Sequence, residues 1–282
     1  MSLTLDRIEV EEDGAAAPAR LAAAIHLQLG ASQSPVPIKE IAYALDIVEI
    51  TESPLSNIEG ALVTTSERDS GSILVNARSS PQRRRYSIAH ELLHFLNPLH
   101  RQTIDGRFAC RSADMVLGSS PRGLDLTLHQ RQEIEANRFS IELLAPKARM
   151  KPYLRGLADI ANILAAAGEL DISKHAAARR YVELHTERLA VVFGKGNSIL
   201  YQEWNDGFPM LLRRRGDALP EAGPSREAVT TMDEVEAALW LKWPGRDRLY
   251  AQTHFQSDGY SIMLLLAETP TDDDVETQPQ FR

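Results

Sequence analysis

The residues best suited to chemistry lie between Tyr86 and Leu96, where His90, Glu91 and His94 form the pattern His-Glu-x-x-His. On a helix, residues four apart lie on one face, so both imidazoles can reach a single ion. Neutral imidazole is a good zinc ligand, and a catalytic zinc keeps one coordination position for water. Glu91 would stand beside that water and can take its proton as a general base. The spacing therefore predicts a zinc-dependent hydrolase site.

The alternative is an ordinary surface helix that carries the same three residues without a metal. Apolar residues surround the motif on most sides of the expected helix: Ile88, Leu92, Leu93, Phe95 and Leu96. A buried set of polar side chains is costly unless a metal or hydrogen bonds compensate it. The composition around the motif therefore favours the metal site.

A second expected helix, residues 131–146 with a proline at its end, offers a third ligand. Glu133 shares a helix face with Asn137, which can support a ligand by hydrogen bonding. Glu135 and Glu142 fall on another face. We therefore assign the third ligand to Glu133, with one Zn²⁺ ion per chain. The alternative is that Glu133 is an exposed carboxylate near the helix start, stabilised by the helix dipole.

Two blocks of sequence carry a further signal: Ile73–Asn76 followed by Arg85–His94, and Glu133-x-x-Ala136-Asn137-x-Phe139-Ser140-x-x-Leu143-Leu144-x-Pro146. Together they resemble the ImmA/IrrE family of metallopeptidase-like proteins, over residues 35–190. The resemblance implies zinc ligands at His90, His94 and Glu133 and a general base at Glu91, as in gluzincin-type peptidases. Leu92 stands where family members often carry glycine, but this change touches no ligand.

The resemblance also implies a substrate, namely an XRE-like DNA-binding repressor or an antitoxin. Limited cleavage of such a protein would derepress stress-response or mobile-element genes. The rival hypothesis keeps the metal as a structural staple in a transcriptional regulator that does not cleave. Three residues are candidates to stabilise the oxyanion: His129, Tyr153 and His100. His129 lies four residues before Glu133, on the same face if the helix starts that early.

Length and charge indicate a cytoplasmic protein with more than one module. The chain has 282 residues, 43% of them hydrophobic, and a formal net charge of −8. No apolar run reaches the roughly 18 residues of a membrane span, and the N-terminus lacks the apolar core of a signal peptide. A single cysteine suits a reducing compartment. The acidic balance argues against nucleic-acid binding by charge alone.

The expected fold class is α+β, with a zincin-like minimal peptidase domain of helices and a small antiparallel sheet. A helix-turn-helix-like segment and a C-terminal α+β module follow. The expected parts are a flexible N-terminus at 1–17, the peptidase-like domain at 18–150, the helical segment at 151–188, the module at 189–268 and an acidic tail at 269–282.

Within the first domain we expect helices at 19–29 and 38–45 and strands at 48–50, 60–64 and 72–76. An exposed edge of this sheet could bind an extended peptide by strand addition, and the alternative is that the edge is covered. The glycine-rich and serine-rich spacer at 100–130 is expected to be a long loop that could gate a substrate groove.

The helical segment allows two interpretations. Helices at 157–167 and 174–184, joined by a turn and capped by Ser173, resemble a helix-turn-helix. Four residues could then touch DNA: Lys174, His175, Arg179 and Arg180. We favour a structural role instead, because the chain is acidic and shows no second basic element to hold phosphates.

The C-terminal module is expected to be a sheet with one helix. Strand-like segments lie at 189–193, 198–204, 208–213, 249–255 and 260–267, and a helix-like segment at 232–241. Hairpin turns are expected at 194–197 and 257–259. By analogy with the appended domains of IrrE-like proteins, this module would be a sensor.

Overall fold

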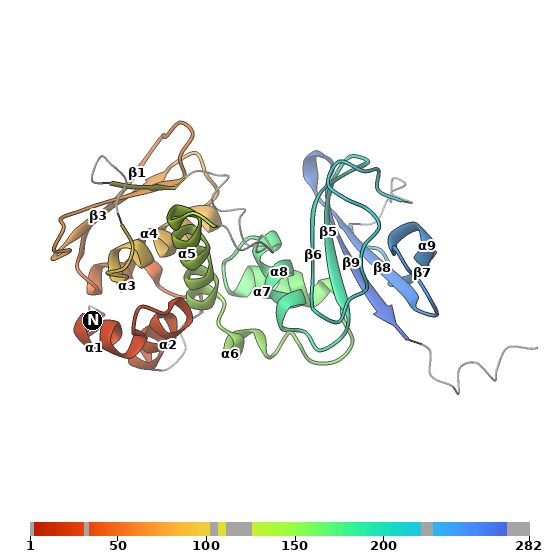
Figure 1. Cartoon of the computed structure of the whole chain (residues 1–282), viewed down its shortest axis with the longest axis horizontal. Helices are drawn as coiled ribbons and strands as arrows, with labels where there is room; N and C mark the ends of the chain where they lie inside the picture. The colour runs from red at the N-terminus through yellow and green to blue at the C-terminus, as the bar shows by residue number, and fades with distance from the viewer. Residues whose placement is uncertain (1–2, 31–33, 102–106, 111–125, 221–227, 270–282) are drawn as a thin grey trace, which may run out of the picture. The chain divides into compact units, whose positions relative to one another are not determined.

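The computed structural model describes residues 3–30, 34–101, 107–110, 126–220 and 228–269. The chain divides into two compact units, the first comprising Met1–Arg149 with Ala167–Ser173 and the second comprising Met150–Ala166 with Lys174–Arg282. Helices and two small sheets make up the described part, so the predicted α+β class is confirmed (Figure 1). Within these residues, no helix has the length and hydrophobicity that a membrane crossing requires.

The N-terminal segment that we expected to be flexible contains a helix, α1 (Arg7–Gly14). The Asp6 side chain caps its first turn, and the Arg7 guanidinium pairs with Glu11 one turn later. Val10 is fully buried. The sequence did not predict this helix, because the segment is acidic and because one buried valine and one cap are a weak signal. Two further helices follow, α2 (Pro18–Leu29) and α3 (Ile38–Ala44).

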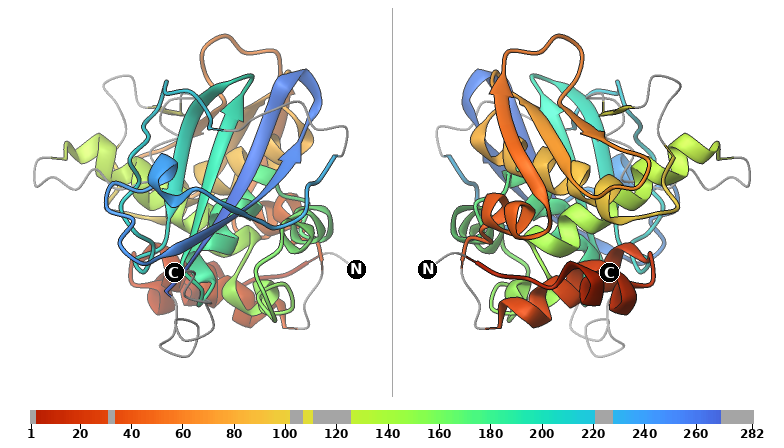
Figure 2. Two further views of the ribbon diagram at one scale, coloured as in Figure 1. Left: turned by 90° about the vertical axis from the view of Figure 1, so that its right-hand side faces the viewer. Right: turned by 90° about the vertical axis from the view of Figure 1, so that its left-hand side faces the viewer.

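The first sheet has the strand order β1-β3-β2-β4, with bounds β1 (Ile47–Ser53), β2 (Gly60–Thr64), β3 (Gly71–Asn76) and β4 (Arg107–Cys110). Strands β2 and β3 form an antiparallel hairpin, and β4 pairs antiparallel with β2. Strand β1 pairs parallel with β3, so the sheet is not antiparallel throughout as we expected. The alternation of apolar residues marks strands but does not reveal their partners. Figure 2 (right) shows this sheet with the helices of the first unit.

Strand β4 lies in the spacer that we expected to be a loop, and it covers the edge of β2. In the described part of the first sheet, the edge strands are therefore β1 and β4. The remainder of the spacer, at 102–106 and 111–125, lies outside the described residues.

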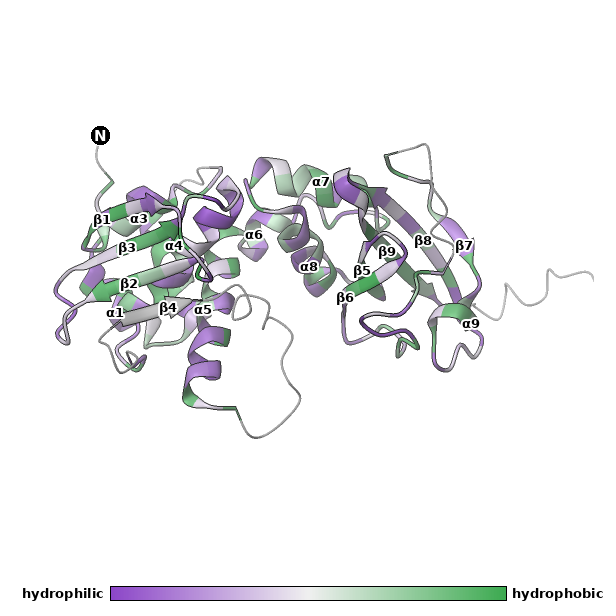
Figure 3. Ribbon diagram, turned by 90° about the horizontal axis from the view of Figure 1, so that it is seen from above, coloured by the Kyte–Doolittle hydropathy of each residue, from purple (hydrophilic) through white to green (hydrophobic). Residues whose placement is uncertain are grey.

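Two longer helices pack against each other in the first unit, α4 (Pro81–Leu96) and α5 (Leu128–Leu144) (Figure 1). Ser80 caps α4, which is longer than the stretch that the motif required. A capping box between Thr127 and Gln130 starts α5 three residues earlier than we expected. The first turns of α5 are mainly hydrophilic (Figure 3). A short helix, α6 (Lys147–Met150), follows.

The predicted helical pair is present as α7 (Ile160–Glu169) and α8 (Lys174–Leu184). The proposed DNA contacts of α8 are engaged with other side chains. Arg180 is 1% exposed and pairs with Glu183. Arg179 pairs with Glu203 on the second sheet, and the ring of His175 packs edge-on against Phe193. Lys174 Nζ lies 3.0 Å from His254 Nε2. These contacts favour the structural role for α8.

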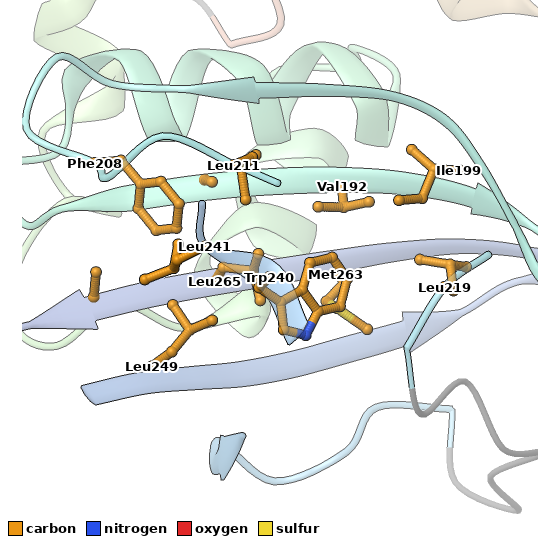
Figure 4. Packing of buried hydrophobic residues seen from close by; sticks show 12 residues of the cluster. Val192, Ile199, Phe208, Leu211, Leu219, Trp240, Leu241, Leu249, Met263 and Leu265 are labelled. Atoms are coloured by element: carbon orange, nitrogen blue, oxygen red, sulfur yellow. The ribbon is translucent and has the colours of Figure 1, made fainter. Parts of the chain in front are cut away.

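The second sheet has the order β6-β5-β9-β8-β7 (Figure 2, left). Its strands are β5 (Leu189–Lys195), β6 (Ser198–Trp204), β7 (Asp233–Val235), β8 (Arg248–Phe255) and β9 (Tyr260–Glu268). A short 3-10 helix, η2 (Ser257–Gly259), connects β8 and β9. Trp240 lies in an apolar cluster with side chains from β5, β6, β8 and β9 and from the segments between the strands (Figure 4).

Two expectations for this module were wrong. Residues 208–213 do not form a strand, because Leu211 makes only an isolated bridge to Leu241. The segment 232–241 is not one helix but the edge strand β7 followed by a four-residue helix, α9 (Ala237–Trp240). Most of the expected acidic tail lies outside the described residues.

Candidate metal centre

Three side chains meet where α4 packs against α5. The His90 and His94 rings come from α4 and the Glu133 carboxylate from α5, and all three are buried. Nε2 of His90 lies 3.1 Å from Glu133 Oε2, Nε2 of His94 lies 3.4 Å from Glu133 Oε1, and the two Nε2 atoms are 3.3 Å apart. The structure therefore brings together the three residues that the sequence spacing predicted as ligands.

These distances fit a metal ion held between the two imidazole nitrogens and the Glu133 carboxylate, whose two oxygens face one ring each. A tetrahedral ion with bonds of about 2.0–2.1 Å spaces its ligand atoms about 3.3 Å apart. The observed separations of 3.1, 3.3 and 3.4 Å lie around this value. Imidazole nitrogens and a carboxylate oxygen are also the donor types that divalent transition metals accept. The buried group can thus hold a metal ion.

The ionisation of Glu133 and His94 suits such a role. Burial opposes ionisation of Glu133, but its contacts with the His90 and His94 rings outweigh burial and hold the pKa of Glu133 below its ordinary value. Burial lowers the pKa of His94, so this ring is neutral at pH 7. A carboxylate and a neutral imidazole are the ligand forms that bind a metal.

The remaining motif residue, Glu91, is buried without a hydrogen bond to either carboxylate oxygen among the described residues. Burial raises the pKa of Glu91 to about 8, and the charges of His90 and Glu133 act on it as well. Gly60 of β2 leaves room for this carboxylate, since a Cβ there would lie 2.9 Å from Glu91 Oε1. A buried carboxylate without a protein partner is poised for a proton or a polar ligand.

Asn137, which we expected to support Glu133, also contacts Tyr86 of α4. Its side-chain oxygen accepts a hydrogen bond of 3.0 Å from the Tyr86 hydroxyl. Burial alone would lower the pKa of His90, but the hydrogen bond that His90 donates to Glu133, the charges of Glu133 and Glu91 and, least of all, a hydrogen bond with Asn137 raise it. Asn137 therefore acts on His90, and its support of Glu133 stays a prediction. Tyr86 was not among the predicted site residues, although it lies four residues before His90 on the same face of α4.

Of the candidate oxyanion stabilisers, His100 does not fit that role. It is buried, with Nδ1 2.8 Å from His94 Nδ1 and Nε2 2.9 Å from Glu135 Oε2. Both ring nitrogens are therefore engaged behind His94. The chain turns back after α4, which ends at Leu96, and this turn brings His100 against His94. Glu135, which we placed on another face, was missed because its contact with His100 depends on this turn.

The other two candidates lie in different surroundings. His129 is on α5 and its side chain is 52% exposed, with Nδ1 3.6 Å from Glu133 Oε1. Because α5 starts at Leu128, His129 shares the face of Glu133 as expected and stays a candidate at the edge of the site. Tyr153 is a buried residue of the second unit, and its role stays a prediction.

Comparison with known proteins adds family evidence to this geometry. A family model described as an IrrE N-terminal-like domain, Peptidase M78, matches residues 46–182, which include the three candidate ligands and Glu91. No curated protein matches the sequence significantly. The family match suggests a metallopeptidase.

A solved structure named as a Mycobacterium tuberculosis transcriptional regulator is similar to this chain, with a TM-score of 0.55 and 11% sequence identity. The similarity covers 89% of this chain and 74% of that one. At this identity the likeness shows the fold alone. Residues 46–182 are therefore identified as an IrrE N-terminal-like domain.

Proposed function

We propose that this protein is a zinc-dependent endopeptidase that makes limited cuts in a protein substrate. The observation that carries the proposal is the buried group of His90, His94 and Glu133, with ligand atoms 3.1 to 3.4 Å apart. Beside it stands Glu91, a buried carboxylate without a hydrogen-bond partner among the described residues. The family match supports the same class of enzyme.

In this proposal, His90, His94 and Glu133 hold the zinc. When bound, zinc supplies the Lewis acidity that activates a water and polarises a peptide carbonyl. Glu91 takes the proton from the attacking water and later gives it to the leaving amine. Its buried surroundings favour the protonated form, which makes Glu91 a competent acid once it has taken that proton. His129, at the edge of the site, is the candidate to stabilise the oxyanion.

The proposed substrate is an XRE-like repressor or an antitoxin, whose cleavage would derepress stress-response or mobile-element genes. This part rests on the resemblance to the ImmA/IrrE family and on the family match. A substrate of this kind places the protein in the cytoplasm.

The alternative function is a metal-stabilised transcriptional regulator that does not cleave. The structural similarity to a transcriptional regulator favours it. Direct DNA binding through α8 has less support, because Arg179 and Arg180 form ion pairs with Glu203 and Glu183.

The test compares wild type, Glu91→Gln and the control Glu49→Gln, which makes the same change at an exposed position of β1. Each zinc-loaded protein is incubated with XRE-like repressors encoded beside its gene, and the fragments are mapped by mass spectrometry. We expect wild type and Glu49→Gln to cut, and Glu91→Gln to bind equal zinc without cutting. Cleavage by Glu91→Gln at the wild-type rate would exclude the mechanism, and zinc binding without cleavage by any of the three would favour the regulator.

A further inference from the structure

A chain of hydrogen bonds runs through the first unit behind His94. His94 Nδ1 lies 2.8 Å from His100 Nδ1, and His100 Nε2 lies 2.9 Å from Glu135 Oε2. The two imidazoles are buried, whereas the Glu135 side chain is 43% exposed at the outer end. The three side chains come from α4, from the turn that follows it and from α5.

The donor and acceptor types of the three side chains determine the direction of each hydrogen bond in this series. An ionised carboxylate only accepts, so the Nε2 of His100 must carry the hydrogen that Glu135 receives. A neutral imidazole holds one hydrogen, which leaves His100 Nδ1 as an acceptor. The contact between the two Nδ1 atoms therefore requires that His94 Nδ1–H donates to His100. The remaining nitrogen of His94, Nε2, then carries no hydrogen and presents its lone pair toward His90 and Glu133.

The turn that carries His100 is held independently of His94. The Arg68 guanidinium donates to the backbone carbonyls of Asn97 and His100, at the end of α4. The backbone N–H of His100 donates to the Asn97 carbonyl at 3.1 Å, and the Asn97 side chain donates to Glu135 at 3.3 Å. His100 is thus placed by its own supports and acts on His94 as a fixed acceptor.

We propose that His100 and Glu135 are positioning residues, which hold His94 in the tautomer that presents Nε2 to a metal ion. The inference rests on the proposed metal site but not on proteolysis. Partners of metal-bound histidines commonly set the tautomer and the ring orientation, and their loss costs about 10–100-fold in metal affinity. Glu133 and Glu135 are two residues apart on α5 and would then act on the same ion differently. Glu133 would be a ligand, and Glu135 would be the outermost member of the hydrogen-bond chain that orients His94.

The first test measures zinc affinity by competition with a chromophoric chelator. His100→Phe keeps a ring but removes the acceptor, so we expect affinity to fall about 10–100-fold. His100→Gln offers an amide oxygen to His94 Nδ1–H and should restore affinity to within about threefold of wild type. His26→Phe is the matched control, since His26 is a partly buried histidine of the same unit that bonds the Leu143 carbonyl and should leave zinc affinity unchanged.

The second test reads the tautomer directly, by two-bond ¹H–¹⁵N NMR spectra of metal-free wild type. We expect His94 protonated at Nδ1 and His100 protonated at Nε2. His94 protonated at Nε2, or a His100→Phe variant that binds zinc like wild type, would overturn the inference. This measurement decides the matter even if His100→Phe fails to fold.

A third variant separates this inference from the proposed site. If His94→Ala binds zinc as tightly as wild type, the metal site itself is wrong. If His94→Ala loses zinc while His100→Phe and His100→Gln both match wild type, only the positioning role is wrong.

Discussion

The Glu91 carboxylate lies directly against the backbone of Gly60, so that a Cβ at Gly60 would stand 2.9 Å from Oε1 and 3.3 Å from Cγ of Glu91. The side chain of a helix residue thus occupies the space that a Cβ would need on a strand residue 31 positions earlier in the sequence. Real Cβ atoms do not approach an oxygen so closely, and Glu91 is fully buried with little room to move. The glycine is therefore part of what places the proposed general base.

Gly60→Ala should displace the Glu91 side chain without touching a ligand. We expect the cleavage rate to fall about tenfold or more, because small misplacements of a reacting group are costly. Zinc affinity should stay within about twofold of wild type, since the effect is on the base. Steady-state kinetics and chelator competition measure the two quantities. Gly168→Ala is the control, as no atom lies within 4 Å of a Cβ there, and equal loss in both variants would contradict the argument.

Glu91→Gln should change the pH dependence of the stability of the metal-free protein. Burial raises the pKa of Glu91 to about 8 in the folded state, from an ordinary value of 4.5. Between these values the folded state binds more protons than the unfolded state, so this group makes stability fall as pH rises from about 4.5 to 8. Glutamine removes that loss. At pH 8.5 the variant should be more stable by about 1–4 kcal/mol, with the difference vanishing near pH 4.5.

Thermal melts of metal-free wild type and Glu91→Gln between pH 4.5 and 8.5 check this expectation. A stability difference that is the same at every pH would show that burial does not raise the pKa of Glu91.

Glu133→Gln should abolish the stabilisation that zinc gives. A ligand that binds only the folded state at about 100 times its Kd adds about 2.7 kcal/mol. The wild-type melting temperature should therefore rise with zinc and fall with a chelator, whereas that of Glu133→Gln should respond to neither. Glu142→Gln makes the same change on the same helix, at a residue that pairs with Arg138, and should keep the wild-type response. Zinc-dependent melting in Glu133→Gln would remove Glu133 from the ligand set.

Arg180→Ala tests whether α8 has a structural role or a DNA-binding role. Arg180 is almost wholly buried and its guanidinium lies 2.8 Å from Glu183. Its loss should destabilise the protein by about 1–3 kcal/mol, through lost packing and a broken ion pair. Chemical denaturation measures the change. An unchanged stability together with weaker DNA binding would support the helix-turn-helix interpretation instead.

The ligand set could be predicted because it depends on local periodicity. His90 and His94 are one helical turn apart, and the helix of Glu133 is marked by its own apolar pattern and a terminal proline. Two amphipathic helices in one domain pack by their apolar faces. The meeting of the three side chains could therefore be predicted without knowing the structure of the loop between the helices.

The residues that contact the candidate ligands and Glu91 could not be predicted, because their positions depend on the path of the chain after each helix and strand. His100 reaches His94 only through the turn after α4, and Gly60 matters only because β2 passes over Glu91. The parallel pairing of β1 with β3 is likewise a tertiary property. Helix α1 escaped notice because its stability comes from the Asp6 cap and one buried valine, not from a repeated pattern.

The ligands of the proposed site come from two helices, and His90 and Glu133 are 43 positions apart in the sequence. An ion bound there would cross-link the two ends of this long segment. Closing a long loop reduces the conformational entropy of the unfolded chain. Amide hydrogen exchange in the first turns of α5 should then slow when zinc binds, while exchange within β8 and β9 should not change. The concentration of free zinc would then determine how often the helix that carries Glu133 opens locally. The local dynamics of α5 would therefore depend on zinc availability.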